Sequence, residues 1–227
     1  MVESVLLLGI DTCGPSGTVA LGRLKAGAVE TLGQIELEGR SYSSTLVAAV
    51  GELLGRSGVG LRDLACIVAV SGPGSFTGVR VGLSAVKGLA EPARIPVTAV
   101  SRLAVLAAKA GVGSAALDAH RHEVFLRLGL PGGQAREVLA GAEELAAIDP
   151  APARIALCDD AAQALLAAAW PAAELARSQA PSAADALRLG AAHLQAGEFA
   201  DLALLDGHYL RRSDAEIFGE TPEPHRA

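Results

Sequence analysis

The segment with the clearest chemical potential is a glycine-rich turn, Ser71-Gly72-Pro73-Gly74-Ser75-Phe76-Thr77-Gly78. It joins an apolar run to a helical pattern, so its free N–H groups and the positive end of the helix dipole suit an anion. The turn is not a P-loop, because no Gly-Lys-Ser/Thr follows, and Ser75 lacks the flanking glycines of a nucleophile elbow. The alternative is a tight turn that lets a helix pack closely, and both interpretations stay open.

A second polar pair, Asp11 and Thr12, follows an apolar run at residues 5–10. A carboxylate and a hydroxyl at the end of a strand could meet a phosphate and its metal ion, and the N–H groups of the next turn could approach the same anion. The alternative is that both side chains only open a polar turn. The spacing alone favours this second interpretation.

The histidines and cysteines do not complete a catalytic or metal-binding pattern. His120 and His122 follow Asp118 on one side of a possible strand, but a metal ion would need further ligands in a defined geometry. We therefore interpret both as surface histidines. The three cysteines stand singly in or beside apolar strands, so we expect small core residues rather than nucleophiles; they are Cys13, Cys66 and Cys158.

The elements that would position these residues follow an α/β order. Three strands with tight turns predict an antiparallel meander, and a helix, a strand, a second helix and a further strand come next. A second set of strands and helices follows, so we expect two lobes. The predicted strands are residues 5–10, 18–21, 29–37, 66–70, 96–100, 115–118, 124–130 and 154–158. The first predicted helix begins at residue 41, and the later ones cover residues 76–90, 102–110, 161–169 and 183–195.

The first two helices carry distinctive faces. Leu46, Val50 and Leu53 recur at helical spacing in the first. In the second, Gly78, Gly82 and Ala85 form a row of small residues, which costs helix propensity but lets another backbone come close. This pattern predicts that the second helix packs tightly against a neighbouring element.

Composition bounds the possible functions. The chain has 227 residues, of which 51% are hydrophobic and only 3% aromatic. A disordered chain and an aromatic stacking platform for nucleic acid are therefore both disfavoured. The formal charge of −6 repels phosphate backbones on average. Unpaired cysteines, an acidic N-terminus and the lack of an apolar stretch of about 18 residues favour a soluble cytoplasmic protein.

The turn also carries a resemblance. The motif Gly72-Pro73-Gly74-Ser75-Phe76-Thr77-Gly78-Val79-Arg80 resembles the signature of the TsaB family, also called YeaZ, which is related to TsaD and the glycoprotease family. Further matching segments occur in order over nearly the whole chain: residues 9–12, 40–46, 118–125 and 209–212. Members of this family take part in tRNA threonylcarbamoyladenosine biosynthesis.

The resemblance implies an α/β actin-like ATPase fold of two lobes, each with a mixed sheet flanked by helices. We expect residues 1–101 to form the N-terminal lobe, with about 202–227 packing back on it, and residues 102–201 to form the C-terminal lobe. The family site looks like a degenerate nucleotide or phosphate site, without cofactor or metal, at Asp11, Thr12, Gly72, Gly74 and Ser75. Residues 101–107 lack the two metal-binding histidines of the catalytic relative.

The function that the resemblance implies is that of a non-catalytic subunit. With TsaD and TsaE, it would support transfer of a threonylcarbamoyl group from its adenylate to the adenosine beside the anticodon, in tRNAs that read codons starting with A. Contact with tRNA would be indirect, through the complex. The alternative is an actin-like kinase or ATPase that uses Asp11 and the turn at Gly72 and Gly74.

We expect the two helices of the first lobe to pair with TsaD, or with a second copy of the chain when it is alone. The expected interface residues are Tyr42, Leu46, Val50, Leu53, Gly78, Val79, Gly82 and Ala85. A bulky residue at Gly82 should then abolish pairing and leave the monomer folded. Two segments depart from the family pattern: Tyr42 replaces an expected histidine, and His120 and His122 replace other residues in the 118–125 segment.

Overall fold

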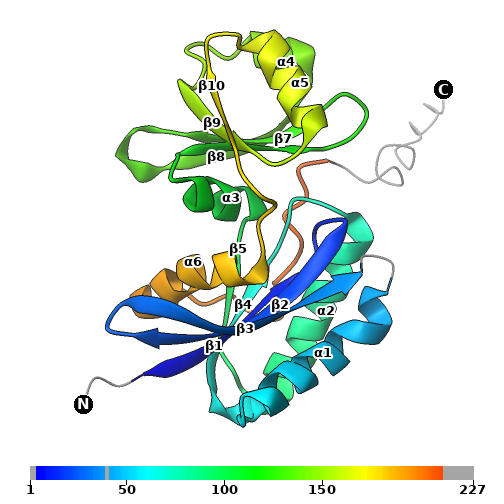
Figure 1. The fold of residues 1–227 in the computed structure, drawn as a ribbon, viewed down its shortest axis with the longest axis vertical. Coiled ribbons are helices and arrows are strands. Elements are labelled where there is room, and N and C mark those ends of the chain that lie inside the picture. Colours follow the sequence, from blue (N-terminus) through cyan, green and yellow to red (C-terminus); the bar gives the residue numbers. More distant parts are fainter. Residues whose placement is uncertain (1–3, 39–40, 212–227) are drawn as a thin grey trace, which may run out of the picture.

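The computed structural model describes residues 4–38 and 41–211, which form two five-stranded mixed sheets flanked by helices (Figure 1). The first sheet has the order β3-β2-β1-β4-β5 and the second the order β10-β9-β6-β7-β8. The strands of the first sheet are β1 (Val5–Asp11), β2 (Ser16–Lys25), β3 (Ala28–Glu38), β4 (Leu64–Val70) and β5 (Val97–Val100). The predicted meander is confirmed, since β1 pairs antiparallel with β2 and β2 with β3.

Helices cover both faces of the first sheet. Helices α1 (Tyr42–Arg56) and α2 (Phe76–Ala93) pack against one face, and α6 (Ala183–Ala196) lies on the other (Figure 1). This double cover explains why the central strands β1 and β4, which pair in parallel, are continuous apolar runs instead of alternating patterns.

The position of helix α6 differs from the predicted division of the chain into two lobes. The range 102–201 assigned it to the C-terminal lobe, but Ala183, Ala186 and Leu187 are buried in the core of the first sheet. The N–H of Ala183 donates to Thr18 Oγ1 at 2.7 Å, which fixes the start of α6 on β2. The apolar period predicts that a helix forms, but it does not say which sheet the helix covers.

The second sheet has its own core. Its strands are β6 (Ser114–Asp118), β7 (Val124–Gly129), β8 (Ala135–Ala140), β9 (Arg154–Leu157) and β10 (Glu174–Arg177). Helices α4 (Ala142–Ala146) and α5 (Asp160–Ala169) complete this half of the chain. Leu126, Leu145, Ile155 and Trp170 are buried together, and Trp170 Nε1 donates to the carbonyl of Leu145 at 3.0 Å. The sequence did not predict β8, α4 and β10, which are short and partly exposed.

Two segments connect the halves. Helix α3 (Arg102–Ala110) contacts β6, β7 and β9 on one side and α6 on the other, and Lys109 Nζ pairs with Asp185 of α6 at 2.8 Å. The segment after α6 returns to the first sheet, where the N–H of His208 donates to the carbonyl of Ser71 at 2.7 Å. The rest of the predicted returning segment, residues 212–227, lies outside the described residues. Within the described ranges, the helices are too short or too polar to span a bilayer.

Candidate functional site: the cleft between the sheets

A cleft of about 1010 Å³ lies where the two sheets face each other. Its floor and one wall come from the β1–β2 turn and from the glycine-rich turn before α2. The other wall comes from the ends of β6 and β9 and from residues 208–211. Of the predicted phosphate-site residues, Gly74 and Ser75 line this cavity, whereas Asp11, Thr12 and Gly72 do not. Asp11 and Thr12 are buried, at 2% and 1% exposure.

Asp11, at the end of β1, forms a buried ion pair. Its Oδ1 accepts the N–H of Cys13 at 2.8 Å, and its Oδ2 lies 3.3 Å from Nε of Arg102. The side chains of Asp11 and Arg102 are only 3% and 8% exposed. Burial alone would lower the pKa of Arg102, but the Asp11 carboxylate and the thiols of Cys13 and Cys158 raise that pKa above its ordinary value. A fixed guanidinium therefore stands beside the carboxylate that the sequence suggested for a phosphate-bound metal ion.

Thr12 holds helix α2 against the β1–β2 turn. Its Oγ1 donates to the carbonyl of Gly78 at 2.7 Å, and the residue is 1% exposed. A Cβ at Gly78 would overlap the Thr12 carbonyl oxygen, and a Cβ at Gly82 would overlap Thr12 Oγ1. The small residues of α2 thus serve a contact within the chain. A bulky residue at Gly82 would therefore disturb the contact with Thr12 as well as any pairing, so the expectation that the monomer stays folded remains a prediction.

The glycine-rich turn is held by similar contacts. The N–H of Ser75 donates to the Cys13 carbonyl at 2.8 Å, and Ser75 Oγ accepts the N–H of Gly78 at 3.2 Å, which caps α2. Gly72 and Gly74 have φ angles of +113° and +157°, values that disfavour other residues. A Cβ at Gly74 would also overlap the Cys13 carbonyl oxygen. The tight-turn interpretation is confirmed, and the predicted anion site stays a prediction.

The expected interface residues require a correction. Tyr42, Leu46, Val50, Leu53 and Val79 are at most 4% exposed and lie in the core of the first sheet. Gly78 and Gly82 are also buried, and Ala85 is half-buried. An apolar stripe on a helix that covers a sheet faces that sheet first. These side chains, except that of Ala85, are therefore not available to a partner in this conformation.

The residues that depart from the family pattern have contacts of their own. Tyr42 donates its hydroxyl to the Gly14 carbonyl at 2.9 Å, and burial together with the charge of Asp11 raises the pKa of Tyr42 to about 12. His120 Nδ1 lies 2.9 Å from Asp118 Oδ2 at the mouth of the cleft, with a side chain that is 85% exposed. This exposure agrees with a surface histidine. In the described ranges, histidines, cysteines and carboxylates form no cluster of three or more that could hold a metal ion.

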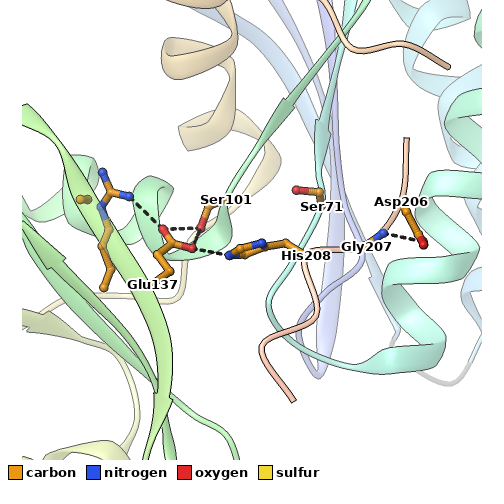
Figure 2. A pocket seen from close by; sticks show the side chains of 8 residues that line it. Ser71, Ser101, Glu137, Asp206, Gly207 and His208 are labelled. Carbon is orange, nitrogen blue, oxygen red and sulfur yellow. Dashed lines mark hydrogen bonds and ion pairs between the residues drawn. The ribbon is translucent and has the colours of Figure 1, made fainter. Parts of the chain in front are cut away.

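A polar network at Glu137 was not predicted. Figure 2 shows its carboxylate between Ser101 and His208, which lie 2.7 and 2.9 Å away. Arg127 Nη1 donates to the same carboxylate at 2.8 Å. Burial raises the pKa of Glu137, but hydrogen bonds from His208, Ser101 and Arg127 outweigh it and leave the pKa below its ordinary value. The contacts run from serine to carboxylate to imidazole, whereas in a hydrolytic triad the imidazole lies between the other two. We therefore assign a structural role.

The network also fixes Arg102. Ser101 caps α3 by accepting the N–H groups of Leu103 and Ala104 at 3.2 and 3.4 Å, and the same hydroxyl donates to Glu137. Arg102 is the next residue in the chain, so the network orients the first turn of the helix that carries the cleft guanidinium. No sequence pattern pointed to Glu137, because its contacts depend on the edge strand β8, which was not predicted.

Known proteins resemble both the sequence and the fold. The family model described as TsaD, tRNA N6-adenosine threonylcarbamoyltransferase, matches residues 36–143. The tRNA threonylcarbamoyladenosine biosynthesis protein TsaB of Haemophilus influenzae is 35% identical over 130 residues, 55% of this chain and 53% of the relative. The solved structure of YeaZ from Pseudomonas aeruginosa is 30% identical, with a TM-score of 0.73, and the alignment covers 91% of this chain and 100% of that one.

The chain belongs to the TsaB/YeaZ family. The predicted resemblance is confirmed, and so is the α/β actin-like fold with two sheets flanked by helices. Component A of (R)-2-hydroxyglutaryl-CoA dehydratase from Acidaminococcus fermentans, 11% identical with a TM-score of 0.52, shares the fold alone. The TsaB of Bacillus subtilis is 36% identical over 126 residues. The chain spans about half the length of these curated TsaB relatives in the alignments, 53% and 54%.

Proposed function

We propose that this TsaB/YeaZ-family chain is a non-catalytic subunit in tRNA threonylcarbamoyladenosine biosynthesis. Its partners would be TsaD and TsaE, and it would act in the cytoplasm. The complex would transfer a threonylcarbamoyl group from the adenylate to the adenosine beside the anticodon. The curated relatives are named for this biosynthesis, and the family model is named for the transferase.

The main support for a non-catalytic role is the ion pair between Asp11 and Arg102. A carboxylate that positions a metal ion at a phosphate needs free lone pairs that face the ligand. Both oxygens of Asp11 accept hydrogen bonds from within the chain, and the residue is 2% exposed. Arg102 opens the helix on which the family resemblance would place the metal-binding histidines of the catalytic relative. The pairing with Arg102 thus supports a role for Asp11 in the fold instead of in metal binding.

The partner surface that we propose is the outer face of α1 and α2. Val47 is 58% exposed there, and a Cβ placed at Gly51, Gly55 or Gly88 would meet open space. A glycine inside a helix costs roughly 0.5–1 kcal/mol relative to alanine. No contact among the residues that the structure describes accounts for these glycines, so a closely approaching partner would explain them. We propose TsaD for this role, and a second copy of the chain when TsaD is absent.

The charge of the chain fits this division of labour. A formal charge of −6 disfavours direct binding to a phosphate backbone. We therefore assign contact with tRNA to the partner proteins.

The test measures how tightly TsaD binds two variants of this chain that carry matched substitutions. Ala48→Arg adds a long charged side chain to the exposed face of α1, and Ala164→Arg makes the same change on the exposed side of α5. We expect Ala48→Arg to weaken pairing at least about tenfold, the scale of one lost interface contact of 1.4 kcal/mol. Ala164→Arg should pair like the parent chain. Equal affinities for both variants would contradict the interface.

The second candidate function is an ATPase or kinase, and the observation that favours it is the convergence of the two turns on one large cleft. Calorimetric titration with ATP and magnesium separates the two functions. The subunit role predicts no turnover. Micromolar binding with hydrolysis, abolished by Asp11→Asn, would establish the enzyme.

A further inference from the structure

The guanidinium of Arg102 is incompletely paired. Its side chain is only 8% exposed, yet Nε is the only side-chain nitrogen with a hydrogen-bond partner among the described residues, and that partner is Asp11. Arg102 lines the cleft, and its two Nη atoms have no acceptor among the residues that the structure describes. Nη2 lies directly against Gly14, where a Cβ would overlap it. A buried guanidinium with free donors is costly unless another acceptor completes it.

The carboxylates that line the cleft are already paired. Asp118 accepts the N–H of His120 at 2.8 Å and lies beside its imidazole. Asp159 accepts the N–H groups of Asp118 and Ala162 at 3.0 and 2.7 Å. The hydrogen-bonding capacity left over deep in the cleft is therefore that of a donor, which calls for an acceptor on the ligand.

The cleft around this donor is largely apolar. Val79 and Leu117 are buried beneath its surface, and Phe125 and Leu210 add to the same lining. Two helix N-termini also face it, because Ser75 caps α2 and Asp159 caps α5, and both caps line the cavity. The positive ends of these helices favour a negative group. The volume of about 1010 Å³ is ample for a small molecule.

We propose that this cleft binds a small organic carboxylate, with its carboxylate on the two Nη atoms of Arg102 and its hydrocarbon part against the apolar lining. Asp11 occupies Nε, so the Nη1–Nη2 edge remains, and this edge matches the spacing of two carboxylate oxygens. A single negative charge suits the site better than a phosphate dianion, because Asp11 lies on the other side of the guanidinium. This binding site is independent of the subunit role.

Octanoate and phenylpropionate are suitable probes, with octanol and octyl phosphate as matched comparisons. Ligand-detected NMR and calorimetry on the full chain should show binding of both carboxylates, weaker binding of octyl phosphate and no binding of octanol at the same concentration. Failure of both carboxylates to bind would overturn the proposal. Octyl phosphate binding more tightly than octanoate would overturn the choice of a carboxylate.

Three variants locate the site. Arg102→Lys keeps a cation beside Asp11 but removes the Nη1–Nη2 edge. The double variant Asp11→Asn, Arg102→Gln removes both charges together. Both should weaken octanoate binding about tenfold or more. Ala180→Trp, at an exposed position of the cleft lining, should block binding even if the first two variants fold poorly. Arg23→Lys, on the exposed side of β2, is the matched control. Unchanged affinity in Ala180→Trp and in a folded Arg102 variant would refute the site.

Discussion

Two glycine-to-alanine substitutions should change stability in opposite directions. Gly51 lies in the middle of α1, where a Cβ would meet no atom within 4 Å. Gly78 lies in the first turn of α2, where a Cβ would overlap the carbonyl oxygen of Thr12. The chemical change is identical at both positions, so the difference measures the surroundings.

The expected magnitudes follow from these surroundings. Gly51→Ala should raise the free energy of unfolding by about 0.5–1 kcal/mol, because the helix loses less backbone entropy on folding and nothing is displaced. Gly78→Ala should lower the free energy of unfolding by about 1–3 kcal/mol. The β1–β2 turn must move to make room for the new methyl group, which weakens the hydrogen bond that the Thr12 hydroxyl donates to the carbonyl of residue 78. For a chain of this size, one kcal/mol corresponds to roughly 2–4 °C in melting temperature.

The assay is equilibrium urea unfolding of both variants and the parent chain, followed by circular dichroism, with thermal melts as a second measurement. Equal m-values would show that the changes reflect native-state stability. A destabilised Gly51→Ala, or a Gly78→Ala as stable as the parent, would refute the assignment of these glycines to an open outer face and to a closed internal contact.

Three further predictions concern the buried polar groups. Asp11→Asn and Arg102→Gln should each destabilise the chain by about 3–5 kcal/mol, and the double variant should cost less than their sum in urea unfolding; additive losses would contradict the ion pair. Because the pKa of Glu137 is lowered in the folded chain, its contribution is present above the ordinary value of 4.5 and is lost as pH falls. Glu137→Gln should therefore flatten the loss of stability on acidification, and an unchanged pH profile would contradict this role. In a Tyr209→Phe variant, Tyr42 is the remaining tyrosine, and its absorbance change should have a midpoint near its pKa of about 12, not near 10.

The sequence predicted the elements of the first sheet well, because their apolar runs are long and their turns carry glycine or proline. The family resemblance grouped Asp11, Thr12 and the glycine-rich turn, and Thr12 does lie against the helix that follows this turn, because its Oγ1 donates to the Gly78 carbonyl. Helix α6 was assigned to the other half, because its periodicity contains no information on which sheet it covers. The strand β8 was missed, and with it the position of Glu137.

Side-chain direction explains the remaining differences. Apolar periodicity marked Leu46, Val50 and Leu53 correctly as one face, but the same pattern describes a core face and an interface. Likewise, the small residues of α2 indicated a close approach, which the structure assigns to Thr12 of the same chain. The pairing of Asp11 with Arg102 joins residues 91 positions apart, and no local pattern encodes it.

The most direct test of the non-catalytic role is reconstituted tRNA modification, with TsaD, TsaE and the synthase that makes the threonylcarbamoyl adenylate. Adding this chain should restore modification, and the Asp11→Asn, Arg102→Gln double variant, if folded, should restore it at a comparable rate because the cleft carries no catalysis. The Ala48→Arg variant should fail. Full modification without the chain would contradict its role as a required subunit, and loss of activity in a folded double variant that still pairs with TsaD would contradict the non-catalytic assignment.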